Sequence, residues 1–91
     1  MMVTWRIQVI GKVQGVYFRA STQEQAARLG LRVWVRNEPD GSVRIAVAGD
    51  RTDFEQFLQW LHQGPPLAEV RKVIVSEASE PVEYKDFRIQ R

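Results

Sequence analysis

The residues best suited to chemistry lie in one short stretch, GKVQGVYFR, which runs from Gly11 to Arg19. Two glycines and two basic residues stand there among apolar ones, where an alternating pattern changes to a helical one. The first N–H groups of a helix have no partners within the helix, and together with the helix dipole they attract anions. Arg19 falls in the first helical turn, where a cation opposes the dipole unless an anion lies nearby. These residues indicate an anion-binding loop, although a glycine turn beside a solvated arginine fits the same pattern.

Asn37 is the second candidate, because it ends a predicted strand just before the turn sequence Glu38-Pro39-Asp40-Gly41. Asparagine at a strand end commonly forms the turn itself, since its side chain mimics a backbone turn. The functional alternative is an amide that holds a water molecule or a substrate oxygen. The residues around Asn37 leave both roles open.

Most other reaction chemistries lack the residues that they need. The chain has no cysteine and a single histidine, His62, so disulfides and thiolate nucleophiles are excluded and a transition-metal site is not expected. A Ser-His-Asp triad is not expected either, because every serine would have to share that one histidine. The formal charge of +2, with acidic residues interleaved along the chain, suits a small anion better than a long nucleic acid.

The length of 91 residues and the apolar content of 44% favour a single domain, residues 1–91, with one hydrophobic core. No apolar run resembles a signal peptide or approaches transmembrane length, so the expected location is the cytoplasm.

The spacing of apolar residues predicts the elements that position these groups. Alternation predicts strands, and recurrence at helical spacing predicts helices. The first expected elements are a strand at 3–9, a helix at 18–29 and a hairpin of strands 32–37 and 43–47. A second helix follows, with Asp50 and Asp53 at its start, apolar residues at helical spacing over 54–61 and Gly64-Pro65-Pro66 at its end. A strand at 70–76 and a short strand at 87–89 complete the chain. The order βαββαβ predicts a ferredoxin-like α+β fold, in which two helices pack on one face of a mostly antiparallel sheet.

Two separate motifs of the chain are typical of a known family. Gly11 to Arg19 matches the signature G-x-V-Q-G-V-x-F-R at every fixed position. A second signature is similar to WVRN at 34–37, followed by DGSV at 40–43 and by Gly49. With further similarity in GPPLAEV at 64–70 and FRI at 87–89, the chain resembles the acylphosphatase family over nearly its whole length. It departs from the family at Val33, where glycine is usual.

The resemblance implies an enzyme that hydrolyses the carboxyl–phosphate bond of acyl phosphates without a metal or another cofactor. Arg19 would bind the phosphoryl group, and Asn37 would position the attacking water. The expected phosphoryl-binding residues, which act largely through backbone amides, are Gln14, Gly15, Val16, Tyr17, Phe18 and Arg19. The expected ligands are a small acyl phosphate and inorganic phosphate. No nucleic acid or membrane partner is expected, and the chain is expected to be a monomer.

Two other functions share this architecture. RNA-recognition domains have the same element order, but their basic and aromatic motif lies in the third strand, and the third strand here, SVRIAVAG, has no aromatic residue. The acylphosphatase-like part of hydrogenase maturation factors is the second alternative, as a non-catalytic or carbamoyl-phosphate-binding module. The presence of both Arg19 and Asn37 in a chain of 91 residues favours an independent enzyme.

Overall fold

The computed structural model describes residues 3–77 and 89–90 of the chain. The elements are, in order, β1 (Val3–Lys12), α1 (Phe18–Arg28), β2 (Arg32–Asn37), β3 (Val43–Gly49), α2 (Arg51–Gln63), β4 (Glu69–Glu77) and β5 (Ile89–Gln90). The predicted βαββαβ order is therefore confirmed. The last short strand begins at Ile89, and Phe87, which was predicted to belong to it, lies outside the described residues.

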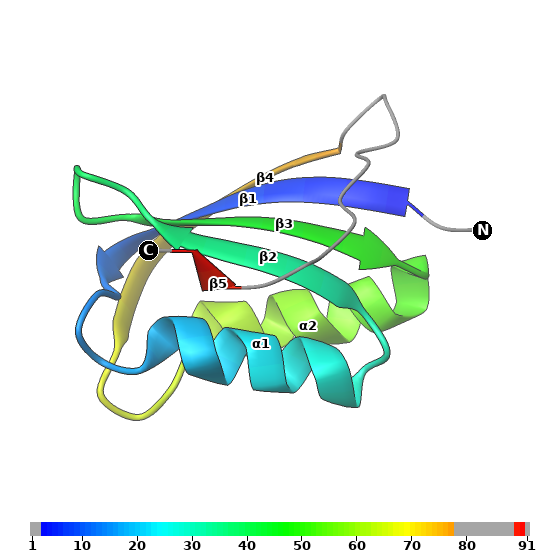
Figure 1. The fold of residues 1–91 in the computed structure, drawn as a ribbon, viewed down its shortest axis with the longest axis horizontal. Coiled ribbons are helices and arrows are strands. Elements are labelled where there is room, and N and C mark those ends of the chain that lie inside the picture. Colours follow the sequence, from blue (N-terminus) through cyan, green and yellow to red (C-terminus); the bar gives the residue numbers. More distant parts are fainter. Residues whose placement is uncertain (1–2, 78–88, 91) are drawn as a thin grey trace.

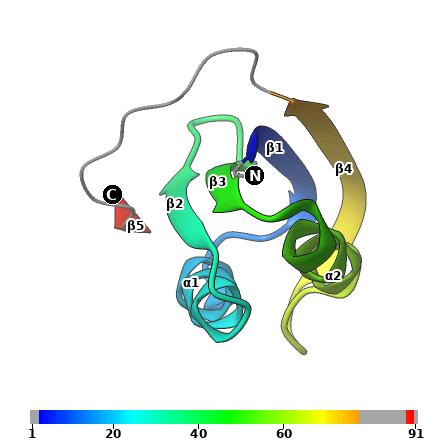
Figure 2. The same ribbon diagram turned by 90° about the vertical axis from the view of Figure 1, so that its right-hand side faces the viewer.

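The strands form one sheet in the order β4-β1-β3-β2-β5. β1 pairs antiparallel with both β3 and β4, and β2 pairs antiparallel with β3. Among the strands of the described residues, the short β5 alone runs parallel to its neighbour, β2. Both helices lie side by side on the same face of this sheet (Figures 1 and 2). The arrangement confirms the ferredoxin-like α+β fold that the alternation predicts.

The core fills the space between the sheet and the two helices. The alternating residues of the strands supply one side, and Phe18 of α1 with Phe54, Phe57 and Leu61 of α2 supply much of the other. Trp5 stacks on Phe54 with ring centroids 3.8 Å apart and an interplanar angle of 4°. The strand residues buried in this core are Trp5, Ile7, Val9, Val33, Val35, Val43, Ile45 and Val47.

The local signals that the sequence contains stand at the two ends of α2. Asp50 precedes α2 and Asp53 lies in its first turn, where negative charge complements the helix dipole. Gly64 ends α2 with φ 70°, a conformation that glycine adopts without steric cost, and two prolines follow. Neither helix in the described residues is long and apolar enough to cross a membrane.

β1 runs on to Lys12, beyond its predicted end at Val9, and this extension decides where the following loop begins. The register between β1 and β4 shifts between Ile10 and Gly11. Gly11 has φ 141°, and a Cβ atom at this position would collide with the backbone carbonyl oxygen of Glu69 in β4. Glycine therefore lets the two strands stay together through the bulge.

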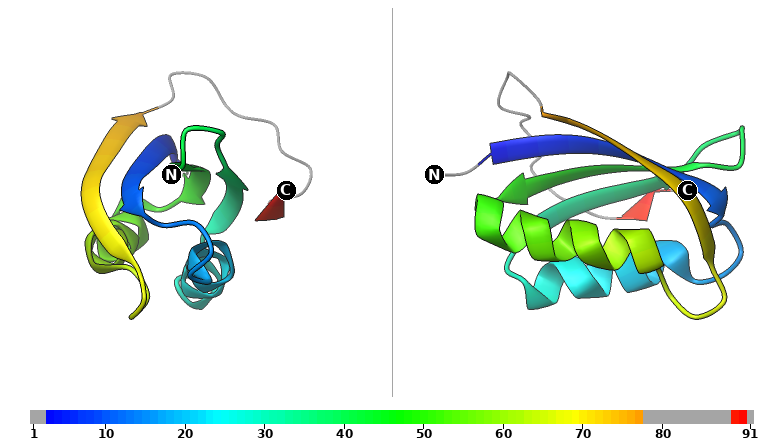
Figure 3. Two further views of the ribbon diagram at one scale, coloured as in Figure 1. Left: turned by 90° about the vertical axis from the view of Figure 1, so that its left-hand side faces the viewer. Right: turned by 180° about the vertical axis from the view of Figure 1, so that it is seen from behind.

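The β1–α1 loop and the hairpin between β2 and β3 lie at the same end of the molecule, on the left in Figure 1 and on the right in the right-hand panel of Figure 3. This juxtaposition brings the two motifs that the sequence singles out into one region.

Candidate active site

The β1–α1 loop turns sharply into the helix. Val13 and Val16 are buried and hold the loop against the core, while Gly15 has φ 74° and Tyr17 has φ 62°. A left-handed backbone costs a non-glycine residue about 1–2 kcal/mol, and such residues concentrate at functional sites. Tyr17 is also 79% exposed. The loop is thus a strained segment supported by its two buried valines.

The loop directs the start of α1 toward a pocket. The N–H of Ser21 donates to the carbonyl of Tyr17 at 3.0 Å, so the N–H groups that precede it along the chain lie outside the helical ladder. No acidic residue occupies the first turn of the helix. No carboxylate of the first turn therefore neutralises the positive end of the helix dipole. This leaves the helix start able to bind an anion.

Asn37 reaches the same pocket because of its place in the strand alternation. It follows Val33 and Val35 on the helix-facing side of β2, and its register partner is the buried Val43 of β3. The amide oxygen Oδ1 is buried and has no hydrogen-bond partner within the part of the chain that the structure describes. A buried polar atom without a partner is costly, so Oδ1 is suited to accept a hydrogen bond from a bound molecule.

The pocket measures about 340 Å³. Its lining residues come from the loop, the first turn of α1 and the end of β2: Val13, Gly15, Tyr17, Phe18, Arg19, Ala20 and Asn37. Arg19 and Asn37, distant in the sequence, therefore share one small cavity, and Arg19 is half-buried there. Of the predicted phosphoryl-binding residues, Val16 and Gln14 are the two that do not line it.

The side chain of Gln14 points instead to the hairpin between β2 and β3. Its Nε2 donates to the backbone carbonyl of Glu38 at 2.8 Å and to that of Ser42 at 2.9 Å. From the sequence, Gln14 is expected only as a source of loop amide contacts, and this attachment of its side chain to the hairpin is not predicted. The type of residue could not reveal it, because both acceptors are backbone atoms of a distant segment.

The hairpin has its own charged and hydrogen-bonded groups. The Oγ and N–H of Ser42 donate to Oδ1 of Asp40 at 2.6 and 2.8 Å, and these bonds, the one from the hydroxyl first, hold the pKa of the Asp40 carboxyl below its usual value. The carboxylate of Glu38 lies 2.7 Å from the guanidinium of Arg36 and 3.4 Å from that of Arg44. Glu38 is therefore balanced by cations of its own hairpin.

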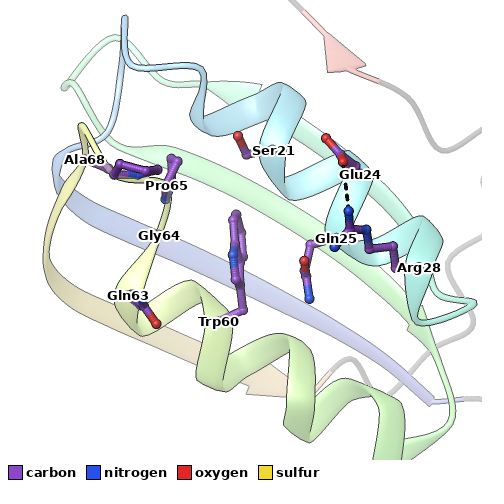
Figure 4. Close-up of a pocket in the computed structure, with 10 residues that line it drawn as sticks. Ser21, Glu24, Gln25, Arg28, Trp60, Gln63, Gly64, Pro65 and Ala68 are labelled. Carbon is purple, nitrogen blue, oxygen red and sulfur yellow. Dashed lines mark hydrogen bonds and ion pairs between the residues drawn. The ribbon is translucent and has the colours of Figure 1, made fainter.

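A second, larger hollow lies between the helices. This groove of about 550 Å³ runs between α1 and α2 and has Trp60 in its wall (Figure 4). Its charged residues, Glu24 and Arg28, pair with each other at 3.4 Å, as their spacing of four residues predicts. The groove shares no lining residue with the pocket at Arg19 and Asn37. The smaller pocket, lined by Arg19 at the start of a helix that has no acidic residue in its first turn, has the chemistry of an anion site, and the larger groove does not.

Among residues 3–77 and 89–90, no group of three or more histidine and acidic side chains lies close enough together to hold a metal ion.

Comparison with known proteins identifies the family. The family model described as Acylphosphatase matches residues 5–89. An acylphosphatase of Marinobacter nauticus is 46% identical over 84 residues, which is 92% of this chain and 91% of that protein. The structure of an acylphosphatase from Coxiella burnetii superposes with a TM-score of 0.90 at 37% identity, covering 98% of this chain and 93% of that one. The crystal structure of full-length HypF in its phosphate- and nucleotide-bound form also matches with a TM-score of 0.90, at 32% identity, but this chain covers only 12% of it. The chain is therefore a hydrolase of the acylphosphatase family.

Proposed function

We propose that this chain hydrolyses the carboxyl–phosphate bond of a small acyl phosphate, with Arg19 as the phosphoryl clamp and Asn37 as the residue that positions water. One observation carries the proposal: Arg19, which carries a guanidinium at a helix start, and Asn37, whose buried amide oxygen Oδ1 has no hydrogen-bond partner among the described residues, line the same 340 Å³ cavity. The first group suits a phosphoryl dianion, and the second suits a neutral hydrogen-bond donor.

The phosphoryl group binds to the loop and the helix start. Backbone N–H groups from Gln14 to Arg19 surround its peripheral oxygens, and the guanidinium of Arg19 donates two parallel hydrogen bonds. These donors also stabilise the charge on the same oxygens in the transition state. The open space around Gly15, where a Cβ atom would meet nothing within 4 Å, allows an anion to approach the backbone.

Asn37 holds the attacking water. Its Oδ1 accepts one water hydrogen, which directs a lone pair of the water oxygen toward phosphorus. As the water oxygen forms a bond to phosphorus, the bond from phosphorus to the acyl oxygen breaks, and the carboxylate leaves with the electron pair. The second water proton passes to an oxygen of the phosphoryl group, so the products are a carboxylate and inorganic phosphate.

This reaction needs no strong acid or base from the protein. The leaving group is the conjugate base of a carboxylic acid with a pKa of about 4, so it departs without protonation. Phosphoryl transfer passes through a loose transition state, in which positioning and charge stabilisation contribute most of the catalysis.

A module that binds an acyl or carbamoyl phosphate without hydrolysing it is the second candidate, and the similarity to one segment of HypF supports it. The higher identity to the Marinobacter protein, and the coverage of 91% of that protein, favour the independent hydrolase.

The test follows benzoyl phosphate by its ultraviolet absorbance in the presence of a chelator. We expect hydrolysis above background by the unmodified chain, neither hydrolysis nor binding of phosphate in a calorimetric titration for Arg19→Gln, and a loss of about 100-fold or more in kcat for Asn37→Ala. The inhibition constant of phosphate should stay nearly unchanged in Asn37→Ala, because the amide contacts the water and not the phosphoryl group.

Arg28→Gln is the matched control for Arg19→Gln, since it removes an arginine from the same helix that makes an exposed ion pair with Glu24. It should keep full activity. Equal loss of phosphate binding in the Arg19 and Asn37 variants would contradict the division of roles, and absence of hydrolysis by the unmodified chain would favour the binding module.

A further inference from the structure

We infer that the side chain of Gln14 is a positioning residue, which ties the phosphoryl-binding loop to the hairpin that carries the water-holding Asn37. This inference rests on the proposed function. Gln14 immediately precedes Gly15 in the loop, and its two acceptors, the carbonyls of Glu38 and Ser42, belong to residues 24 and 28 positions further along the chain. Glu38 is the residue that follows Asn37.

The amide nitrogen of Gln14 has one acceptor for each of its two hydrogens. Nε2 carries two hydrogens, and the two carbonyls lie at 2.8 and 2.9 Å, near the ideal length for such bonds. Each carbonyl also accepts a backbone bond within the hairpin, since the N–H of Gly41 donates to Glu38 at 3.1 Å and the N–H of Glu38 donates to Ser42 at 2.8 Å. Gln14 thus donates the second hydrogen bond that each of these two carbonyls accepts, at the point where the hairpin loop joins its strands.

The hairpin end of this connection is rigid. Ser42 is only 3% exposed, and its Oγ donates to Asp40 at 2.6 Å and accepts from Nε2 of Gln8 in β1 at 3.1 Å. The loop end is held by the buried Val13 on one side of Gln14 and the buried Val16 on the other. A connection between two supported segments transmits position, whereas one between mobile segments does not.

The distance between the attacking water and the phosphoryl cradle therefore depends on Gln14. The cradle itself is formed within the loop and the start of α1, and Asn37 is held by strand pairing with Val43. Removal of the Gln14 side chain leaves both parts intact but releases one from the other. A displacement of about 1 Å between reacting groups can reduce a rate about 100-fold. We expect kcat to fall while the affinity for phosphate is kept.

Gln14→Glu is the discriminating variant, because it preserves shape and removes both donors when the new carboxyl is ionised. At pH 7 we expect kcat to fall about 10- to 100-fold, with the inhibition constant of inorganic phosphate changed less than about threefold. As the pH falls toward about 4.3, the ordinary pKa of a glutamic acid, the introduced carboxyl gains a proton and can donate again to one carbonyl. The ratio of variant to wild-type kcat should then rise. The natural acidic residues of the hairpin are present in both proteins, so their own effects cancel in this ratio.

Gln14→Leu supplies the comparison, since it has similar volume and no donor at any pH. Its kcat should be low at pH 7, and its ratio to wild type should not recover in acid. Gln63→Glu, which places the same substitution at an exposed residue of α2, should keep a ratio near one throughout. Thermal unfolding and far-UV circular dichroism establish that each variant is folded, and if Gln14→Glu does not fold, the split between kcat and phosphate affinity is measured on Gln14→Leu.

Two results would overturn the inference while leaving the proposed function intact: an active wild type whose Gln14 variants keep kcat within threefold, or variants in which phosphate affinity falls as much as kcat. Absence of hydrolysis by the wild type itself would refute the proposed function and the positioning role with it.

Discussion

Val33 offers the sharpest test of how this chain fills its core, because the family pattern usually has glycine there. Its side chain is 4% exposed and faces the helices, and its register partner Val47 pairs in turn with Trp5. In Val33→Gly, the two methyl groups lose about 1.6 kcal/mol of transfer free energy, and the cavity left behind adds about 1 kcal/mol. Removal of Cβ adds about 1 kcal/mol, because glycine weakens a strand. The free energy of unfolding should therefore fall by about 3.5 kcal/mol.

The assay is urea unfolding followed by tryptophan fluorescence, with thermal unfolding beside it. At about 4–8 °C per kcal/mol for a domain of this size, Tm should fall by about 15–25 °C. Val33→Ala is the matched control, which keeps Cβ and should lose about 2.5 kcal/mol. A loss below about 1.5 kcal/mol in Val33→Gly would refute the packing argument. A change of kcat beyond twofold below the unfolding range would refute the view that Val33 acts through the core alone, since Asn37 lies ~13 Å further along the strand at about 3.3 Å per residue.

Three further substitutions test other parts of the structure. Gly11→Ala should lower the free energy of unfolding by about 3 kcal/mol in a urea titration, because a Cβ atom with φ 141° would collide with the carbonyl of Glu69; a loss below 1 kcal/mol would contradict the close approach. Thr22→Val should raise the free energy of unfolding by about 1 kcal/mol, because the buried Oγ1 of Thr22 has no hydrogen-bond partner within the described residues. A lower free energy of unfolding in this variant would mean that the hydroxyl is hydrogen-bonded. Asp40→Asn tests the hydrogen bonds that Ser42 donates to the Asp40 carboxylate. Because these bonds lower the pKa of the Asp40 carboxyl in the folded protein, the unfolded chain binds a proton at this carboxyl more tightly. The stability advantage of wild type over Asp40→Asn should be complete above about pH 4 and diminish as the pH falls below it, and an advantage independent of pH would exclude this origin.

Local patterns predicted the fold well, because each strand has one buried face. Val33 and Val35, or Val43 and Ile45, must point the same way in a strand, so their spacing alone indicates which side meets the helices. The limits of α2 were equally local, since acidic residues at its start and Gly64 at its end act within one turn. The extension of β1 to Lys12 was not predicted, because the bulge at Gly11 depends on its contact with β4.

The candidate site was predicted partly by local chemistry and partly by resemblance. The helix start and Arg19 indicated an anion site by themselves, whereas the expected roles of Arg19 and Asn37 toward a phosphoryl group and water came from the family signatures. One signal was present and unused: Asn37 continues the alternation of Val33 and Val35, which already directs its side chain to the helix-facing side.

The order of apolar and polar residues along the chain is enough to predict the elements, their buried faces and the type of fold, because these properties depend on near neighbours. Three features of the site arise from the packing of distant segments: Asn37 and Arg19 line one cavity, Oδ1 of Asn37 is buried without a partner among the described residues, and the Gln14 side chain reaches the hairpin. These features depend on backbone carbonyls and on the approach of distant segments. No residue type encodes such contacts, and only the packing of the whole sheet against its helices brings them about.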